Sequence, residues 1–273
     1  MQINDIVREA LSEDLGSGDI TAAYLDLDPV SSRAFMVAKA PGVLAGVEVA
    51  KQVFKTVDPD LKITVYRKDG DQVQPKDEIL SIEGKAASIL MGERVALNFL
   101  QRLSGIATQT RQMVNALEGT GVRLLDTRKT TPMLRLLEKY AVRVGGGFNH
   151  RFGLYDMVML KENHIRACGG ITEAMRRVKS HNTSYKVEVE VTNPEELAEA
   201  VAAGADRVML DNMDIPAIKA AAKKYRKQVE LEISGGVTPD NIAKYARAGV
   251  HYISSGSITH SYKSLDISLL FEE

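Results

Sequence analysis

Residues 187–211 have the sequence VEVEVTNPEELAEAVAAGADRVMLD. Two short apolar runs, VEVEV (187–191) and RVMLD (207–211), flank a segment of helix-forming residues (194–203). Apolar runs of this length are typical of buried strands, and the segment between them is long enough for a helix. The stretch therefore predicts a strand–helix–strand unit with parallel strands.

The same alternation extends outward from this unit in both directions. Further apolar runs are LLDT (124–127), MVMLK (157–161), VELEIS (229–234) and VHYISS (250–255), with AVRVGG (141–146) as a candidate for one more strand. Helical stretches separate most of them, at 132–140, 171–180, 214–224 and 238–247. Five to seven such units predict an α/β barrel, complete or incomplete, and not a doubly wound sheet. No GxGxxG fingerprint follows the first strand, which argues against dinucleotide binding.

Residues 1–108 follow a different pattern and predict a small N-terminal α+β domain. A helix at the N-terminus and one at 47–57 accompany strands at 33–40, 61–66 and 79–83, and a long helical pattern covers 86–117. Gly105 interrupts that pattern and predicts a bend near a domain junction. We expect the barrel domain to cover 109–273, with 262–273 as a candidate for packing back on the N-terminal domain.

Composition limits the class of protein. A formal net charge of -1 argues against general affinity for nucleic acid or membranes. The single cysteine excludes an intrachain disulfide and is typical of a reducing compartment. The N-terminus lacks the pattern of a signal peptide, and no run approaches the ~20 apolar residues of a transmembrane helix. We therefore expect a cytoplasmic protein.

Polar residues stand at or just past the ends of the predicted strands. They are Arg128, Lys129, Lys161, Glu190, Asp211, Ser234, Gly235, Gly236, Ser255 and Gly256. The carboxyl ends of the strands of a parallel barrel converge on one mouth, where such enzymes carry out chemistry. The scaffold is therefore expected to bring these sequence-distant residues together.

A basic region overlaps this set. Residues 123–166 contain nine Lys and Arg against four Asp and Glu, a balance of 9 − 4 = +5 in a chain of net charge -1. Several of these cations close apolar runs, and His150 and Arg151 follow three glycines. Fixed cations in such places suit a small, multiply anionic ligand. The alternative for any single one is a solvated surface charge.

Two carboxylates, Glu190 and Asp211, end neighbouring strands. They suit Mg2+ bound together with a phosphate-bearing substrate, but equally suit hydroxyl groups, a developing cation or structural pairing with nearby lysines. Glu188 has the same parity as Glu190 and sits deeper, which favours a structural role.

Small residues follow the last two strands, in ISGGV (233–237) and SSGSITHS (254–261). They let backbone N–H groups approach an anion, so they predict a phosphate site. His260 either contributes to that site or only caps a turn beside it. No nucleophile–base pair stands out. We therefore expect a reaction driven by binding, electrostatics and metal.

Several of these motifs together resemble one known family. DTRKTTP (126–132), GGGFNHR (145–151), LKENH (160–164), VEVEV, MLDN, ISGGV and SSGSITHS, preceded by NFLQRLSGIAT (98–108), resemble quinolinate phosphoribosyltransferases in the same order. The resemblance covers nearly the whole chain. Met133 departs from it, because the family usually carries glycine after TTP.

The resemblance implies a type II phosphoribosyltransferase fold, in which a small N-terminal domain joins an open α/β barrel and homodimers share active sites. It implies transfer of phosphoribosyl from phosphoribosyl pyrophosphate to quinolinate with decarboxylation, giving nicotinate mononucleotide, pyrophosphate and CO2 in NAD biosynthesis.

The resemblance also implies roles for individual residues. The quinolinate carboxylates would meet Arg102, Arg128, His150, Arg151 and Lys161. Pyrophosphate would meet Lys129 and Lys161, while Glu190 and Asp211 would hold Mg2+ and the ribose hydroxyls. Lys129, Lys161, Glu190 and Asp211 form the expected catalytic set. The 5′-phosphate would meet Ser234, Gly235, Gly236, Gly256 and His260, and Thr127 and Ser255 complete the predicted substrate-binding set.

Three other functions remain open at this point. The first is the same scaffold acting on another aromatic acid. The second is an aldolase-type barrel with Lys161 as a Schiff-base lysine, and the third is a non-catalytic phosphate-binding module.

Overall fold

The computed structural model describes residues 2–182 and 184–272, and the chain divides into two compact units. The first unit contains the residues up to Arg111, Thr131–Gly146 and the residues from Tyr262 onward. The second, called the barrel unit below, contains Gln112–Thr130 and Gly147–Ser261. In the described part of the chain, no helix is both long and apolar enough to cross a membrane.

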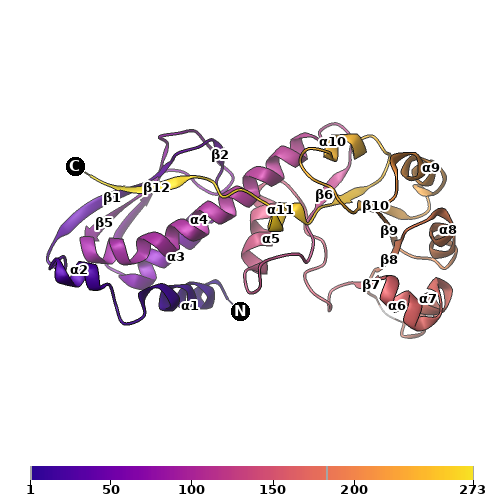
Figure 1. The fold of residues 1–273 in the computed structure, drawn as a ribbon, viewed down its shortest axis with the longest axis horizontal. Helices are drawn as coiled ribbons and strands as arrows, with labels where there is room; N and C mark the ends of the chain where they lie inside the picture. Colours follow the sequence, from indigo (N-terminus) through magenta and orange to yellow (C-terminus); the bar gives the residue numbers. More distant parts are fainter. Residues whose placement is uncertain (1, 183, 273) are drawn as a thin grey trace. The chain divides into compact units, whose positions relative to one another are not determined.

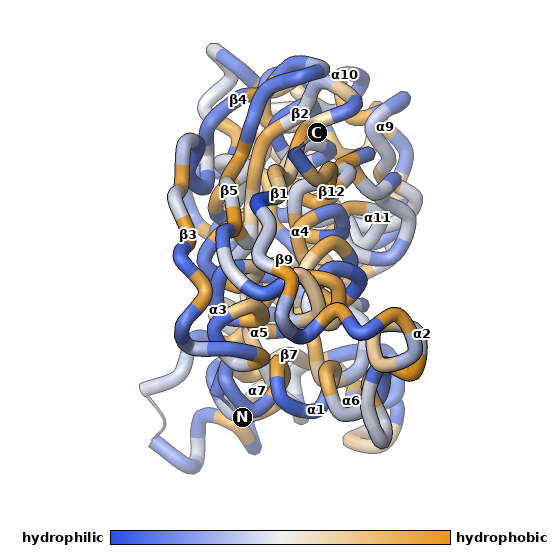
Figure 2. The backbone as a smooth tube through the Cα atoms, turned by 90° about the vertical axis from the view of Figure 1, so that its left-hand side faces the viewer, coloured by the Kyte–Doolittle hydropathy of each residue, from blue (hydrophilic) through white to orange (hydrophobic). Residues whose placement is uncertain are grey.

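The first unit is built on a four-stranded antiparallel sheet in the order β12-β1-β5-β3. Its strands are β1 (Ser31–Ala38), β3 (Lys62–Val65), β5 (Glu78–Lys85) and β12 (Ile267–Phe271). Alternate residues of β1, namely Ala34, Met36 and Ala38, are fully buried, as expected for a strand with one face on the core. The edge strand β3 is largely exposed, and its alternation of polar and apolar residues is visible in Figure 2.

The remaining elements of this unit are mostly helical. They are α1 (Ile3–Leu15), α2 (Ile20–Tyr24), α3 (Val47–Val57), α5 (Arg135–Val144) and the small sheet of β2 (Gly42–Val43) and β4 (Gln72–Val73). Helix α4 runs over Ala86–Asn115, and its residues up to Arg111 belong to this unit.

One local prediction is wrong. Residues 141–146 form the end of α5 and the turn after it, because Leu137 and Ala141 are buried one helical turn apart and a short apolar run does not reveal its period. Helix α4 includes Gly105, and the two units divide six residues later, after Arg111. A Cβ at Gly105 would lie 2.9 Å from the Cα of Ser264, so this glycine permits close approach of the chain.

The barrel unit is a six-stranded parallel sheet in the order β6-β11-β10-β9-β8-β7. The strands are β6 (Arg123–Leu125), β7 (Val158–Leu160), β8 (Val187–Val191), β9 (Arg207–Asp211), β10 (Glu230–Ser234) and β11 (Tyr252–Ser254). Strands β6 and β7, the first two of this unit in the sequence, lie at opposite edges of the sheet. No hydrogen-bonded pairing joins them within the described residues. The barrel is therefore open between β6 and β7, and the predicted fold class is confirmed.

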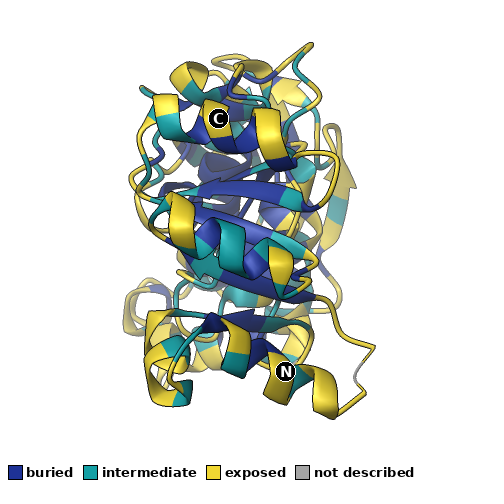
Figure 3. Ribbon diagram, turned by 90° about the vertical axis from the view of Figure 1, so that its right-hand side faces the viewer, coloured by how far each residue is buried: buried dark blue, intermediate teal, exposed yellow. Residues whose placement is uncertain are grey.

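Helices follow the strands of this unit in Figure 1, where α7, α8 and α9 lie outside β7, β8 and β9. The helices are α6 (Glu162–Cys168), α7 (Ile171–Ser180), α8 (Pro194–Ala202), α9 (Ile215–Tyr225), α10 (Ile242–Tyr245) and α11 (Ser257–His260). Figure 3 shows buried strands behind helices whose outward faces are exposed. Helix α8 begins where the sequence predicts, because the side chain of Asn193 accepts a hydrogen bond from the Glu196 amide and Pro194 occupies the first turn.

Candidate active site

A cavity of about 720 Å³ opens in the barrel unit where the strands end. Its lining includes all but one of the predicted site residues: Thr127, Arg128, Lys129, His150, Arg151, Lys161, Glu190, Asp211, Ser234, Gly235, Gly236, Ser255, Gly256 and His260. The exception is Arg102, which belongs to the first unit. The parallel register explains this convergence, because Asp211 and Ser234 are direct partners at the ends of β9 and β10.

Cations crowd one side of the cavity. The Arg151 side chain is mostly buried, and its Nη1 donates to the Met157 carbonyl at 3.2 Å. Burial and the neighbouring Arg128 guanidinium lower the pKa of Arg151. Neighbouring cations of this kind are stabilised by an anionic ligand that binds between them.

A second group of charges lies beside them. The Lys161 ammonium is 2.6 Å from a carboxylate oxygen of Glu190, and Asp211 accepts a hydrogen bond from the Asn212 side-chain amide at 2.9 Å. The two carboxylates supply hard oxygen ligands at the rim of the cavity, which is the donor type that Mg2+ prefers. The residues present therefore fit a magnesium ion shared with a phosphate-bearing ligand.

The loops after the last strands have backbone conformations that need glycine. Gly235 and Gly236 have φ of +95° and +60°, in the left-handed region. The Ser255 hydroxyl donates to the Val237 carbonyl at 2.6 Å and pairs with the Ser257 hydroxyl, which ties the two loops together. A Cβ at Gly256 would lie 2.9 Å from the Lys129 side chain. Both loops thus expose backbone to the cavity at close range.

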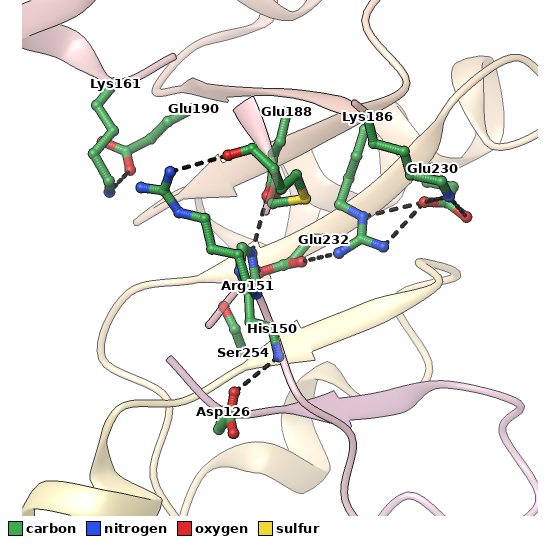
Figure 4. Close-up of polar contacts among 12 residues, drawn as sticks. Asp126, His150, Arg151, Lys161, Lys186, Glu188, Glu190, Glu230, Glu232 and Ser254 are labelled. Carbon is green, nitrogen blue, oxygen red and sulfur yellow. Dashed lines mark hydrogen bonds and ion pairs between the residues drawn. The ribbon is translucent and has the colours of Figure 1, made fainter. Parts of the chain in front are cut away.

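A buried polar layer, drawn in Figure 4, lies beneath the cavity, because Glu188 and Glu232 precede the lining residues Glu190 and Ser234 by two positions on the same strands. It contains His150 with Glu188 and Glu232, whose side chains have no exposed surface. Burial raises the pKa of each carboxyl to about 7, and for Glu232 the neighbouring Glu188 adds to this. The three residues offer ligand atoms within 4.8 Å of one another, so the group meets the distance requirement of a metal site.

Sequence reasoning missed several lining residues. They are Met159, Met209, Asn212, Val237, Thr238, Ser254 and Ser257. A signal existed for the two methionines, because Met159 and Met209 stand two residues before Lys161 and Asp211 and so share their side of the strand. Asn212 directly follows Asp211 and has a left-handed φ of +53°, a conformation that asparagine adopts more readily than most residues.

Arg102 occupies a polar setting of its own in the first unit. Its guanidinium binds the fully buried Glu138 carboxylate and the Thr131 hydroxyl, and it lies 5.0 Å from the centroid of the Tyr262 ring. Nearby, Met133 has a φ of +70°, a conformation that favours glycine.

Family models match almost the whole chain. The model of the quinolinate phosphoribosyl transferase N-terminal domain matches residues 19–104, and that of the C-terminal domain matches residues 106–270. The chain belongs to the quinolinate phosphoribosyltransferase family. The family suggested by the motifs is thereby confirmed.

Relatives in this family share much of the sequence. The chain is 44% identical over 270 residues to the probable nicotinate-nucleotide pyrophosphorylase [carboxylating] of Bacillus subtilis, covering 98% of this chain and 93% of that protein. It is 43% identical to the chloroplastic nicotinate-nucleotide pyrophosphorylase [carboxylating] of Arabidopsis thaliana, covering 97% and 81%. The solved structure of the Francisella tularensis nicotinate-nucleotide pyrophosphorylase has a TM-score of 0.95 and 44% identity, covering 99% and 96%.

Proposed function

We propose that this chain is an enzyme that transfers phosphoribosyl from phosphoribosyl pyrophosphate to quinolinate with decarboxylation. The products are nicotinate mononucleotide, pyrophosphate and CO2. One observation carries the assignment from the structure: a single cavity combines crowded cations, two carboxylates and two glycine loops. The cations match the dicarboxylate and the pyrophosphate, the two carboxylates match the ribose, and the glycine loops match the 5′-phosphate.

The cations suit the dicarboxylate. Arg128, Arg151 and Lys161 line space in which two carboxylates are neutralised better than one. The His150 ring lines the same cavity, but its Nδ1 accepts from the Arg151 N–H and its Nε2 faces Glu188, so it does not bind the substrate as the family resemblance implies. In the described part of the chain the Lys129 ammonium has no hydrogen bond or ion pair, so it is available for pyrophosphate as that group leaves.

The carboxylates suit the sugar. Cleavage at the anomeric carbon develops positive charge on the ribose ring, and Glu190 and Asp211 stabilise that charge while binding the hydroxyls. The same two residues would hold Mg2+, which would supply neutralising charge for the pyrophosphate oxygens. The backbone N–H groups of Gly235, Gly236 and Gly256 face the 5′-phosphate.

Decarboxylation needs no separate cofactor. Once ribosylated, the ring nitrogen of the substrate is cationic, and it stabilises the electron pair left on the adjacent ring carbon when the carboxylate departs as CO2. A proton from solvent then bonds to that carbon and completes nicotinate mononucleotide. The protein's part is to hold the substrate still and keep its carboxylates neutralised until transfer.

We further propose a cytoplasmic homodimer in which Arg102 serves the partner's site. The family resemblance suggests this role, and a two-fold interface would place both copies symmetrically. The single cysteine is consistent with a reducing compartment.

A pyrophosphate-release assay with quinolinate and nicotinate in parallel tests the function. Quinolinate should yield pyrophosphate, CO2 and nicotinate mononucleotide in equal amounts when Mg2+ and phosphoribosyl pyrophosphate are present. Nicotinate should react at least about a hundredfold less efficiently, because one set of buried cations stays unpaired. Comparable turnover of nicotinate would assign the chain to another aromatic acid.

A further inference from the structure

The two carboxyl groups of the buried layer, Glu188 and Glu232, have no part in the chemistry described so far. Glu188 on β8 and Glu232 on β10 are wholly buried, and both point toward His150 in Figure 4. Buried carboxylates are costly, and apolar residues of similar size in their place are often as stable. A pair of them directly under a ligand cavity therefore suggests a role in positioning.

The two ring nitrogens of His150 face different protein groups. The backbone N–H of Arg151 donates to Nδ1 at 2.7 Å. A ring nitrogen that accepts a hydrogen bond carries no proton, so in the neutral ring the proton is on Nε2. Nε2 lies 2.9 Å from an oxygen of Glu188 and 3.6 Å from an oxygen of Glu232. The two carboxyl groups thus face the protonated side of the ring.

Contacts at both ends extend this cluster. Arg207 on β9 donates to Glu232 at 3.1 Å and stacks 4.0 Å over the Tyr252 ring. At the other end, Arg151 is held at its backbone N–H by His150 and at its guanidinium by the Met157 carbonyl. A continuous set of contacts therefore runs from Arg207 to Arg151, the most buried cation of the cavity lining.

The geometry assigns a role to this set. We propose that Glu188 and Glu232, with Arg207, are positioning residues that hold His150 in the Nε2–H tautomer and thereby fix Arg151 for a substrate carboxylate. The identity of that substrate rests on the proposed function, whereas the tautomer rests on the contacts of the protein alone. Glu188 also supports the positive charge of Arg151 across the cluster.

A metal ion in the same place is the competing explanation, because His150, Glu188 and Glu232 are close enough to bind one. Coordination through Nε2 would require an unprotonated Nε2 and a proton on Nδ1. Nδ1 could then no longer accept the N–H of Arg151. The observed 2.7 Å contact therefore favours a proton over a metal ion.

Two substitutions at Glu188 distinguish a role in positioning His150 from a general contribution to stability. Glu188→Gln keeps an oxygen that faces Nε2–H, and Glu188→Met removes it at similar size. We expect Glu188→Met to raise the KM for quinolinate by about tenfold or more, the usual effect of losing the group that orients a functional histidine. The KM for phosphoribosyl pyrophosphate should change less than about twofold, and Glu188→Gln should recover most of the quinolinate affinity.

Nitrogen-15 NMR of the histidines supplies a readout that is independent of turnover. The signal of His150, assigned by its loss in His150→Gln, should show Nε2–H with an unprotonated Nδ1 at pH 7.5 in the wild-type protein, with or without added Zn2+. An Nδ1–H tautomer, an imidazolium or a Zn2+-dependent shift would overturn the proposal even if Glu188→Met does not fold. Equal KM changes for both substrates would also overturn it. If wild-type protein released no pyrophosphate from quinolinate, the proposed function would fail while the NMR result still decided the tautomer.

Discussion

The Lys161 ammonium lies 2.6 Å from the Glu190 carboxylate, and both side chains line the cavity of the barrel unit. Each therefore neutralises the other before any ligand arrives. Ligand binding must separate the two side chains. Lys161 suits pyrophosphate or a substrate carboxylate, whereas Glu190 suits Mg2+ or the ribose. The pair keeps a cation and a carboxylate available in a cavity that is mostly positive.

The two carboxylates at the strand ends should act as one unit. We expect Glu190→Gln and Asp211→Asn each to lower kcat by about ten- to a hundredfold and to shift the Mg2+ titration to higher concentration, because a hydrogen bond to a charged group is worth about 1.5–3 kcal/mol. The double variant should lose less than the product of the two effects. Glu195→Gln, on the exposed start of α8, is the matched control. Unchanged Mg2+ curves in both single variants would make Glu190 and Asp211 structural.

Arg151 should contribute by shape as well as charge. Arg151→Ala should reduce kcat/KM for quinolinate by about ten- to a hundredfold while the protein stays folded. Arg151→Lys should recover only part of the lost kcat/KM, since the ammonium lacks the planar, bidentate geometry of the guanidinium. Arg247→Ala, at an exposed site, should behave as wild type. Steady-state kinetics with circular dichroism spectra decide the matter, and near-wild-type values for Arg151→Ala would contradict the assigned role.

Mixing two inactive variants tests whether Arg102 acts across a dimer. If it does, a mixed dimer of Arg102→Ala and Glu190→Gln has one intact site and one doubly damaged site. Random exchange makes half of the dimers mixed, so activity should return to about a quarter of wild type. If activity does not recover after subunit exchange is confirmed with labelled protein, Arg102 acts within its own chain, where it binds Glu138.

Met133 should carry backbone strain. Its φ of +70° costs a non-glycine residue about 1 kcal/mol, and its side chain is 68% exposed, so little packing offsets the strain. Met133→Gly should raise the free energy of unfolding by about 0.5–1 kcal/mol. Met133→Ala keeps the Cβ and should give no gain. Urea denaturation followed by circular dichroism measures both, and equal stability of the two variants would show that the backbone conformation is not strained.

Stability should fall as pH rises through the titration of Glu232. Burial raises the pKa of this carboxyl from 4.5 to about 7, so the folded state holds its proton over that interval while the unfolded state has lost it. The folded state therefore loses relative stability between about pH 4.5 and 7. Glu232→Gln cannot ionise, so its unfolding free energy should decline less between pH 5 and 8, by up to about 3 kcal/mol. Parallel declines in wild type and variant would show that another group is responsible.

Much of this molecule follows from local pattern. VEVEV and RVMLD form β8 and β9 with the predicted bounds, and the polar residues at the strand ends meet because parallel strands share one direction. Residues 141–146 form a helix end and the turn after it, although their apolar run also suits a strand. Six residues cannot distinguish a buried strand from a helix end.

Other features depend on contacts distant in the sequence. Parity placed Glu188 under Glu190, but nothing local indicates that His150 would turn its Nε2 toward both Glu188 and Glu232. Asn212 lines the cavity from a left-handed backbone, a conformation that asparagine tolerates but that its residue type alone does not predict.

The interleaving of the two units has a mechanical consequence. Both α1 and β12, and hence the outermost described residues at either end, belong to the first unit, while the barrel unit lies wholly between positions 112 and 261 of the chain. A pulling force applied to the termini must therefore pass through the first unit before it reaches the barrel. Under load, the β12–β1 ladder and its neighbours would rupture first, and the barrel, with its cavity, would bear tension only after they had given way.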